Sequence, residues 1–297
     1  MAPMVSSSLN GRSDDPAPLL RQEGGLLSRR HLLRAAGAVA LGTAAGTAAH
    51  GFLYERHQIE VTEQTLDVAG WPSALSGLKI GFLTDLHRSS TVSHEMIAHA
   101  VDLVMARQPD LIIVGGDYVT NRDRRFIQPA ADALAKLTAP HGVFAVLGNH
   151  DDERDVPAAL QSAGFAVLRD ARTQIAIHNE PVDIAGLRYW THRMADITRV
   201  VRGASPTLLM IAHTPKRLVE AMALSVPLLL CGHTHGGQIV LPGIGAVAAR
   251  EFPIIAGAER RENTTVFVSR GVGTVYIPVR VNCPPEVAIL RIQPLMG

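Results

Sequence analysis

From about residue 59 onward, short runs of apolar residues alternate with segments in which apolar residues recur at helical spacing. Uninterrupted apolar runs of this length are typical of buried strands, and a spacing of three to four residues is typical of helices that pack along one face. The apolar runs predict strands at residues 78–84, 111–114, 143–147, 208–212 and 227–231. The spaced segments predict helices at residues 93–107, 126–137, 157–163 and 215–222.

Three further segments, 166–187, 264–269 and 287–292, have the pattern of strands. The first of them is long enough for consecutive strands, which do not require a helix between them. Alternating strands and helices favour parallel neighbours, whereas consecutive strands favour antiparallel ones. The pattern therefore predicts an α/β protein whose sheets are not purely parallel.

Polar motifs follow the apolar runs in a regular way. In open α/β sheets, the loops that leave the carboxyl ends of strands converge at one edge, which is where ligands bind. Five polar residues stand at or just after the ends of five different predicted strands, and we expect them to lie close together. These residues are Asp85, Asp117, Asn149, His213 and His233.

These positions and their neighbours supply three oxygen ligands and four imidazoles, which is enough for two adjacent divalent-metal sites. Taken singly, most of the motifs have an ordinary structural explanation, because Asp and Gly favour turns and a His before Thr-Pro is common at a helix entry. The GHxH of residues 232–235 and the GNHD of residues 148–151 are harder to explain by packing. Their joint appearance favours metal-assisted hydrolysis.

The ordered series D-x-H, GD, GNHD, H and GHxH, complete between Asp85 and His235, resembles the calcineurin-like metallophosphoesterase superfamily. The tail segments 269–273 and 280–286 further resemble its exported bacterial branch of YkuE/YaeI-like phosphoesterases. The resemblance covers residues 59–293. It implies a metallophosphoesterase sandwich of two mixed β-sheets flanked by helices, with a dinuclear metal site at one sheet edge.

The resemblance also implies a role for each motif residue. One metal is expected on Asp85, His87 and His235, the other on Asn149, His213 and His233, with Asp117 bridging both. Oxygen and nitrogen ligands without thiolate favour Mn, Fe or Zn, and Mg suits so many imidazoles less well. A hydroxide that bridges the metals would attack the phosphorus of a phosphate ester.

His150 and Asp151 are left as catalytic candidates outside the metal coordination. The resemblance implies that His150 faces the substrate, where it hydrogen-bonds the phosphoryl group or protonates the leaving oxygen, and that Asp151 fixes its tautomer. The alternative is that His150 only orients a metal ligand.

The N-terminal region carries the pattern of an export signal. Residues 1–27 lack periodicity and are expected to be a disordered leader, while residues 28–34 (SRRHLLR) resemble the twin-arginine motif and residues 35–49 are uncharged and rich in Ala and Gly. We expect residues 1–50 to be the leader and signal, 51–58 a linker and 59–293 the catalytic domain. The interpretation implies the twin-arginine machinery as a partner and the periplasm or cell envelope as the location.

Whether the signal is removed stays open. Residues 49–51 (AHG) fit a cleavage site, but the charge-free stretch continues through Tyr54, and about 20 such residues can span a bilayer as an anchor.

Composition narrows the function further. With 28 basic and 27 acidic residues, the net charge of +1 offers no basic surplus for nucleic acid, and two Trp and four Tyr give little stacking surface for bases. Cys231 and Cys283 are too few for a disulfide framework, although a single bridge between them stays open in an exported protein.

The sequence thus predicts a phosphoesterase, with phosphodiesterase favoured, that acts on a phosphate ester such as a cell-envelope or lipid phosphate. Two alternatives stay open: a UDP-diacylglucosamine-type pyrophosphatase, which the export motif disfavours, and a non-catalytic metal-binding scaffold, which the complete ligand set disfavours. Five basic residues are candidates for binding the substrate's anionic group, although solvated turns explain them equally well. They are Arg122, Arg124, Arg125, His192 and Arg193.

Overall fold

The computed structural model describes residues 28–296, so the predicted leader at residues 1–27 lies outside the described residues. The chain divides into two compact units, residues 1–44 and 45–297. Helix α1 (Arg29–Leu53) begins in the first unit and ends in the second. The helical stretch at residues 29–57 is long and apolar enough to cross a membrane, with a mean hydropathy of 1.3, a criterion that a signal sequence also meets.

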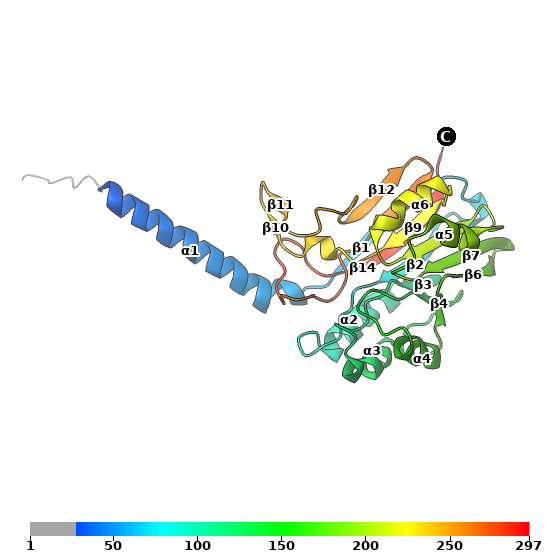
Figure 1. The fold of residues 1–297 in the computed structure, drawn as a ribbon, viewed down its shortest axis with the longest axis horizontal. Helices are drawn as coiled ribbons and strands as arrows, with labels where there is room; N and C mark the ends of the chain where they lie inside the picture. Colours follow the sequence, from blue (N-terminus) through cyan, green and yellow to red (C-terminus); the bar gives the residue numbers. More distant parts are fainter. Residues whose placement is uncertain (1–27, 297) are drawn as a thin grey trace, which may run out of the picture. The chain divides into compact units, whose positions relative to one another are not determined.

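Two six-stranded sheets form the second unit (Figure 1). In the first sheet, β14 and β2 are antiparallel and every other neighbouring pair is parallel. In spatial order its strands are β1 (Glu60–Val68), β14 (Glu286–Pro294), β2 (Leu78–Leu83), β3 (Leu111–Val114), β4 (Val143–Ala145) and β5 (Ala166–Val167).

The second sheet has four parallel strands in its centre and an antiparallel strand at each edge. Its order is β12 (Gly257–Arg261), β13 (Thr264–Val268), β9 (Leu228–Cys231), β8 (Leu208–Ala212), β7 (Glu180–Leu187) and β6 (Ala171–Ile177). A separate hairpin is formed by β10 (Val240–Leu241) and β11 (Gly245–Ala246).

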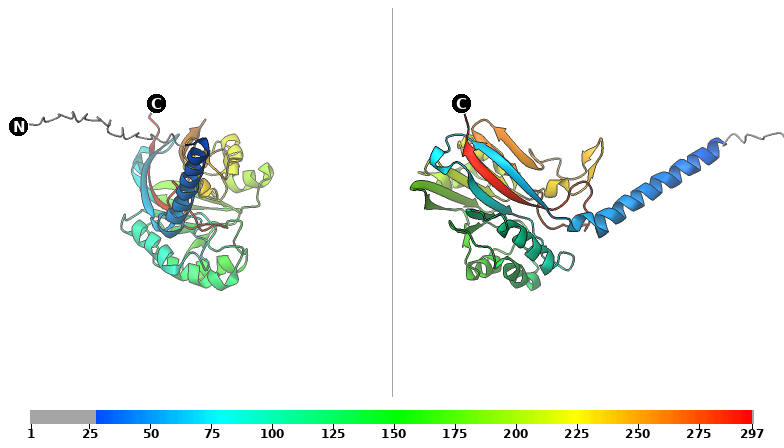
Figure 2. Two further views of the ribbon diagram at one scale, coloured as in Figure 1. Left: turned by 90° about the vertical axis from the view of Figure 1, so that its left-hand side faces the viewer. Right: turned by 180° about the vertical axis from the view of Figure 1, so that it is seen from behind.

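Helices cover the outer faces of both sheets, and the two inner faces pack on each other (Figure 2). Strand β3 shows how this arises: Leu111 and Ile113 point into the core between the sheets, while Ile112 and Val114 point toward the helices. The first sheet carries α2 (His94–Met105), α3 (Ile127–Leu134) and α4 (Asp155–Ser162); the second carries α5 (Met194–Val201) and α6 (Leu218–Ala223). The predicted sandwich of two mixed sheets flanked by helices is confirmed.

The predicted elements agree with the structure best where both faces of a strand are buried. Strands β3 and β8 have the predicted bounds, and the helix expected at 215–222 starts as a 3-10 turn (Pro215–Arg217) before α6. The sequence did not indicate α5 or the edge strands β1 and β12. Strand β1 reads EVTEQTLDV and is half exposed, so it lacks an apolar run.

Residues 51–58, expected to be a linker, are helical at first and are held within the second unit. Gly51 is buried, and a Cβ there would lie 2.3 Å from the carbonyl oxygen of Arg280. After the 3-10 turn Glu55–His57, the side chain of Glu55 accepts a hydrogen bond of 2.7 Å from the N–H of Cys283, and Arg56 donates one of 3.2 Å to the carbonyl of Thr91. The end of α1 therefore contacts the segment that precedes β14.

Candidate metal centre

The parallel strands of both sheets end at one edge, and the predicted polar residues follow there. Asp85 follows β2, Asp117 follows β3 and Asn149 follows β4 in the first sheet; His213 follows β8 and His233 follows β9 in the second. Backbone hydrogen bonds join these strand ends, among them Asp85 N–H to Gly116 O at 2.9 Å and Gly232 N–H to His213 O at 2.9 Å. The geometry expected from the strand order is therefore present.

The chain turns sharply at the predicted ligands. Five of the seven have positive φ angles, a conformation that costs about 1–3 kcal/mol for a residue with a side chain and that concentrates at functional sites. They are Asp85 (54°), His87 (48°), Asp117 (56°), His233 (73°) and His235 (51°).

Two neighbouring positions require glycine, because the carboxylate of a predicted ligand approaches each of them too closely for a Cβ. A Cβ at Gly148 would lie 2.0 Å from Asp117 Oδ1, and one at Gly232 would lie 2.3 Å from Asp85 Oδ2. The glycines of the GNHD and GHxH motifs therefore leave room for the two carboxylates.

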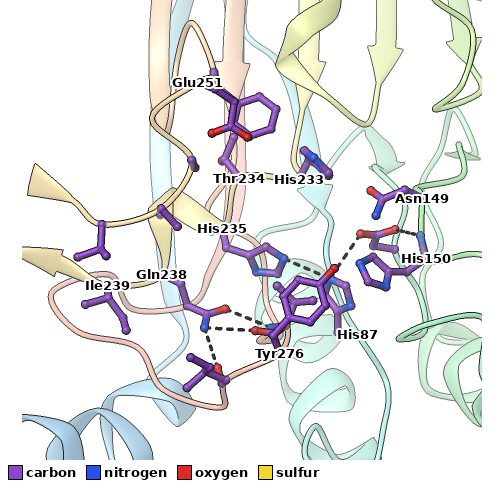
Figure 3. A pocket seen from close by; sticks show the side chains of 18 residues that line it. His87, Asn149, His150, His233, Thr234, His235, Gln238, Ile239, Glu251 and Tyr276 are labelled. Carbon is purple, nitrogen blue, oxygen red and sulfur yellow. Dashed lines mark hydrogen bonds and ion pairs between the residues drawn. The ribbon is translucent and has the colours of Figure 1, made fainter.

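Six of the seven predicted ligands form two groups, each with ligand atoms within 4.8 Å of one another. Asp85, His87 and His235 form the first group. His87 Nε2 lies 3.1 Å from His235 Nε2 (Figure 3), and His235 Nε2 lies 3.4 Å from Asp85 Oδ1. Three atoms that can each offer a lone pair therefore converge in a buried space, where a cation would satisfy all of them.

Asp117, His213 and His233 form the second group. His213 donates from Nδ1 to the carbonyl of Gly115 at 2.8 Å, which turns its Nε2 toward Asp117 Oδ2 at 3.1 Å. Asn149 Oδ1 is buried and, within the part of the chain that the structure describes, has no hydrogen-bond partner. An orphaned amide oxygen beside this group fits a metal ligand.

Asp117 lies between the two groups. Its Oδ2 is 3.5 Å from His87 Nε2 in the first group and 3.1 Å from His213 Nε2 in the second. Its Oδ1 accepts a hydrogen bond of 2.8 Å from the N–H of His150. One carboxylate thus faces both groups, as a bridging ligand requires.

Comparison with known proteins agrees with this geometry. A family model described as calcineurin-like phosphoesterase matches residues 78–237, a range that contains all seven predicted ligands. The chain belongs to the calcineurin-like phosphoesterase family. It is a hydrolase of phosphoric esters, and the two candidate ligand groups correspond to the dinuclear divalent-metal site that this family uses.

Relatives extend the match beyond that domain. The phosphodiesterase YaeI of Escherichia coli is 32% identical over 90% of this chain and 100% of its own length. The uncharacterized metallophosphoesterase YkuE of Bacillus subtilis is 30% identical over 90% of this chain and 98% of its own. Among solved structures, the NAD nucleotidase NadN of Haemophilus influenzae is 12% identical to this chain and has a TM-score of 0.47. The match covers 66% of this chain and 45% of the NadN chain.

Burial and the two carboxylates set the protonation of this phosphoesterase site. Burial lowers the pKa of His87 to about 4 and that of His233 to about 3, so both imidazoles are neutral at pH 7. Burial also lowers the pKa of His213, but Asp117 and Asp85 raise it further, to about 10. A proton and a metal ion therefore compete for His213 Nε2.

The expected role of Asp151 is corrected by the structure. Its buried carboxylate accepts hydrogen bonds from the backbone N–H groups of Asp117 (2.8 Å), Tyr118 (2.8 Å) and Gly148 (2.9 Å), and so it holds two ligand-bearing loops together. The tautomer of His150 is fixed instead by the N–H of Asn121, which donates to His150 Nδ1 at 3.0 Å.

Several residues that surround the ligands were not predicted from the sequence to have a role at the site. Thr84 donates to Asp85 Oδ2 at 2.9 Å, and the rings of Tyr189 and Phe252 lie 5.3 and 5.1 Å from the ring of His233. Arg280 is fully buried and donates to the carbonyls of Gly273 (2.6 Å) and Cys283 (3.0 Å) behind His235. Their contacts depend on tertiary packing, which no local pattern reveals.

The predicted substrate-binding cations lie elsewhere. Arg124 pairs with Asp155, Arg125 with Asp123 at 2.6 Å, and Arg193 with Asp196 at 3.9 Å. Within the described residues, none of the five candidates lines the cavity above the metal ligands; Arg122 and His192 also lie outside its wall. Both cysteines are buried and free, so the bridge left open by the sequence is absent between Cys231 and Cys283.

Removing the central carboxylate should empty both metal positions. We expect Asp117→Ala to lose both metal ions and its phosphoesterase activity together, because Asp117 faces both ligand groups. Elemental analysis of the purified chain measures this, with the exposed Asp132→Ala as the matched control. A variant that retains two metals per chain would refute the bridging position.

Metal affinity should rise with pH. The pKa of His213 is about 10, so at lower pH metal binding must displace a proton from this imidazole. The imidazoles of His87 and His233 are already neutral at pH 7. The apparent Kd for Mn²⁺ should fall about tenfold per pH unit between about pH 7 and 8.5, with one proton released. Calorimetry in two buffers of different ionisation enthalpy measures both quantities. A pH-independent Kd would contradict the assignment.

Proposed function

We propose that this protein is a phosphodiesterase of the cell envelope with a dinuclear Mn, Fe or Zn centre. The observation that carries the diester preference is the cavity above the ligands, about 430 Å³ in volume. Beyond the ligands and His150, the described residues of its wall include the carboxylate of Glu251 but no Lys or Arg. A diester carries one negative charge, so it needs no further cation once its phosphate reaches the metals, whereas a monoester carries up to two.

The ligand set fits the metals that the sequence favours. We assign one ion to Asp85, His87 and His235, the other to Asn149, His213 and His233, and the bridge to Asp117. Divalent ions held there supply Lewis acidity, which lowers the pKa of a water molecule and offsets the negative charge of the phosphate. The chain holds these ligands through buried hydrogen bonds, such as His213 Nδ1 to Gly115 O, that fix each lone pair before a metal arrives.

His150 acts on the substrate as a hydrogen-bond donor. Its ring lines the cavity, and because Nδ1 accepts from the N–H of Asn121, the proton of the neutral ring is on Nε2. Burial lowers the pKa of His150, which further favours the neutral ring. Of the two roles expected from the sequence, donation to a phosphoryl oxygen therefore fits the geometry better than proton transfer to the leaving group.

The alternatives are less consistent with the site. A nucleotide-linked pyrophosphatase binds two adjacent phosphates, and among the residues that the structure describes no Lys or Arg lines this cavity to bind the second one. A non-catalytic scaffold has no need for a buried, strained and complete set of ligands beside an open cavity.

The phosphodiesterase proposal predicts hydrolysis of bis(p-nitrophenyl) phosphate in preference to p-nitrophenyl phosphate by the full chain reconstituted with Mn, Fe or Zn. His150→Ala should keep its metals and lose about 100-fold or more in kcat, the usual effect of removing one donor to a developing oxyanion. His150→Gln, which restores a donor, should recover part of the loss.

His99→Ala provides the matched control, because His99 is exposed on α2 and away from the ligands. Near-wild-type turnover by His150→Ala would remove His150 from catalysis. Absence of hydrolysis of both aryl esters with every metal would overturn the phosphodiesterase proposal and favour the scaffold.

The location in the cell envelope rests on the twin-arginine pattern at the start of α1 and on the apolar stretch that follows it. We expect R29K/R30K to keep the chain in the cytoplasm, because the export machinery reads the arginine pair. Cell fractionation measures the distribution, with Arg34→Lys as the control. Unchanged export of the double variant would contradict the twin-arginine route. The fraction of the wild-type chain that sediments with the membranes reports whether the anchor is retained.

A further inference from the structure

Large exposed apolar side chains line the cavity or stand on the hairpin beside it. We call four of them the apolar rim: Ile244 (63% exposed), which lies between β10 and β11, Val247 (52%), Tyr276 (80%) and Ile277 (57%). Val247, Tyr276 and Ile277 line the cavity itself, and the Tyr276 ring lies 5.9 Å from the ring of His150. Exposed apolar side chains that gather beside a binding cavity mark a site of interaction.

The rim is held in place by hydrogen bonds of the loops that carry it. Gln238, three residues after the ligand His235, donates from its amide to the carbonyl of Ile277 at 2.7 Å and accepts from the N–H of Val275 at 3.1 Å (Figure 3). Val240 N–H donates to Val281 O at 2.9 Å. The two loops are thus joined to each other beside the cavity.

The charge of the cavity favours one kind of substituent. Its wall contributes Ile239, Val247, Phe252 and Ile277 together with the carboxylate of Glu251, which repels further anionic groups. An extended polyanion, such as a nucleic acid or a chain of phosphates, therefore meets no Lys or Arg among the described residues of the wall. Beside the wall, Lys216 Nζ lies 4.7 Å from the Phe252 ring and offers a single positive charge. An apolar substituent on the phosphate is accommodated.

The end of α1 lies beside the chain segment that follows the rim. Within the unit of residues 45–297, Gly51 packs on Val279 and Arg280, which follow the Tyr276–Ile277 part of the rim after Pro278. The next residues, Phe52 (42%), Leu53 (70%) and Tyr54 (57%), are exposed. One short segment of the chain thus joins the apolar rim to the end of a helix with the length and composition of a membrane span.

We propose that the substrate is a lipid phosphodiester taken from a bilayer, into which the apolar rim inserts. This inference rests on the phosphodiesterase proposal. The lipid chain lies along the apolar wall and its phosphate reaches the metal ligands. Water adds at phosphorus, the bond from phosphorus to one ester oxygen breaks, and the leaving oxygen takes a proton; the products are a phosphomonoester and an alcohol.

Two aryl diesters that differ only in the apolar substituent test the inference. Hexadecyl p-nitrophenyl phosphate in detergent micelles or phosphatidylcholine vesicles is compared with methyl p-nitrophenyl phosphate, using the full metal-loaded chain. We expect a kcat/KM at least about tenfold higher for the hexadecyl ester, because its chain is removed from water on the wall. The double variant I244D/I277D should lower the hexadecyl-to-methyl ratio about tenfold or more.

Val219→Asp is the matched control, since Val219 is 68% exposed on α6, outside the cavity wall, and its substitution should leave the ratio unchanged. If I244D/I277D does not fold, Tyr276→Asn replaces it in the test, because Asn tolerates the φ of 58° at that position. Tyr276→Asn should also lower the ratio.

The outcomes separate the two proposals. Hydrolysis of the methyl ester with no preference for the hexadecyl ester overturns the lipid substrate and leaves the phosphodiesterase intact. Failure to hydrolyse either ester counts against the phosphodiesterase itself. Light scattering tests a third outcome, in which the rim binds a second copy of the chain. A wild-type dimer that becomes monomeric in I244D/I277D, together with an unchanged hexadecyl-to-methyl ratio, would show this and would overturn insertion of the rim in lipid.

Discussion

Repulsion among converging acceptor groups is the constraint on which the rest of the structure depends. Asp85 and Asp117 are both buried, and the Nε2 atoms of His87 and His235 face each other at 3.1 Å. Burying such groups is unfavourable unless positive charge stands between them. Burial raises the pKa of Asp85 to about 6, while His213 keeps that of Asp117 low despite its burial. The fold is thus stable at this edge only with protons or metal ions among the ligands.

The loops that hold these ligands are themselves stabilised by buried charge. The Asp151 carboxylate accepts four backbone hydrogen bonds, the longest of them 3.4 Å from the N–H of Val119, and burial, aided by Asp117, raises its pKa to about 7. Arg280 binds the carbonyls that lie behind His235, and Glu286 accepts a hydrogen bond of 2.7 Å from the N–H of Arg270. These contacts offset the strain of the positive φ angles, so the ligand atoms are positioned before a metal binds.

The apolar pattern of the sequence predicted strand bounds best where both faces of the strand are buried. Strands β3 and β8 are buried on both faces, and their apolar runs define their bounds; β1 is an edge strand with alternating polar residues, and it was missed. Ligand positions followed from strand ends. The pairing of His150 with Asp151 was wrong because adjacency in sequence says nothing about direction: the turn sends one side chain to the cavity and the other to the backbone.

One turn, at residues 235–238, connects a metal ligand to the apolar rim. His235 belongs to the first ligand group, and Gln238 bonds to both ends of the Val275–Ile277 loop that carries half of the rim. Both residues have positive φ angles, 51° and 57°, so the segment between them is tightly turned. A substituent that presses on the rim therefore acts on the same turn that orients His235. In the proposed lipid phosphodiesterase, recognition of an apolar group and positioning of the phosphate would be coupled through the turn at residues 235–238. This coupling would favour amphiphilic substrates over small polar ones.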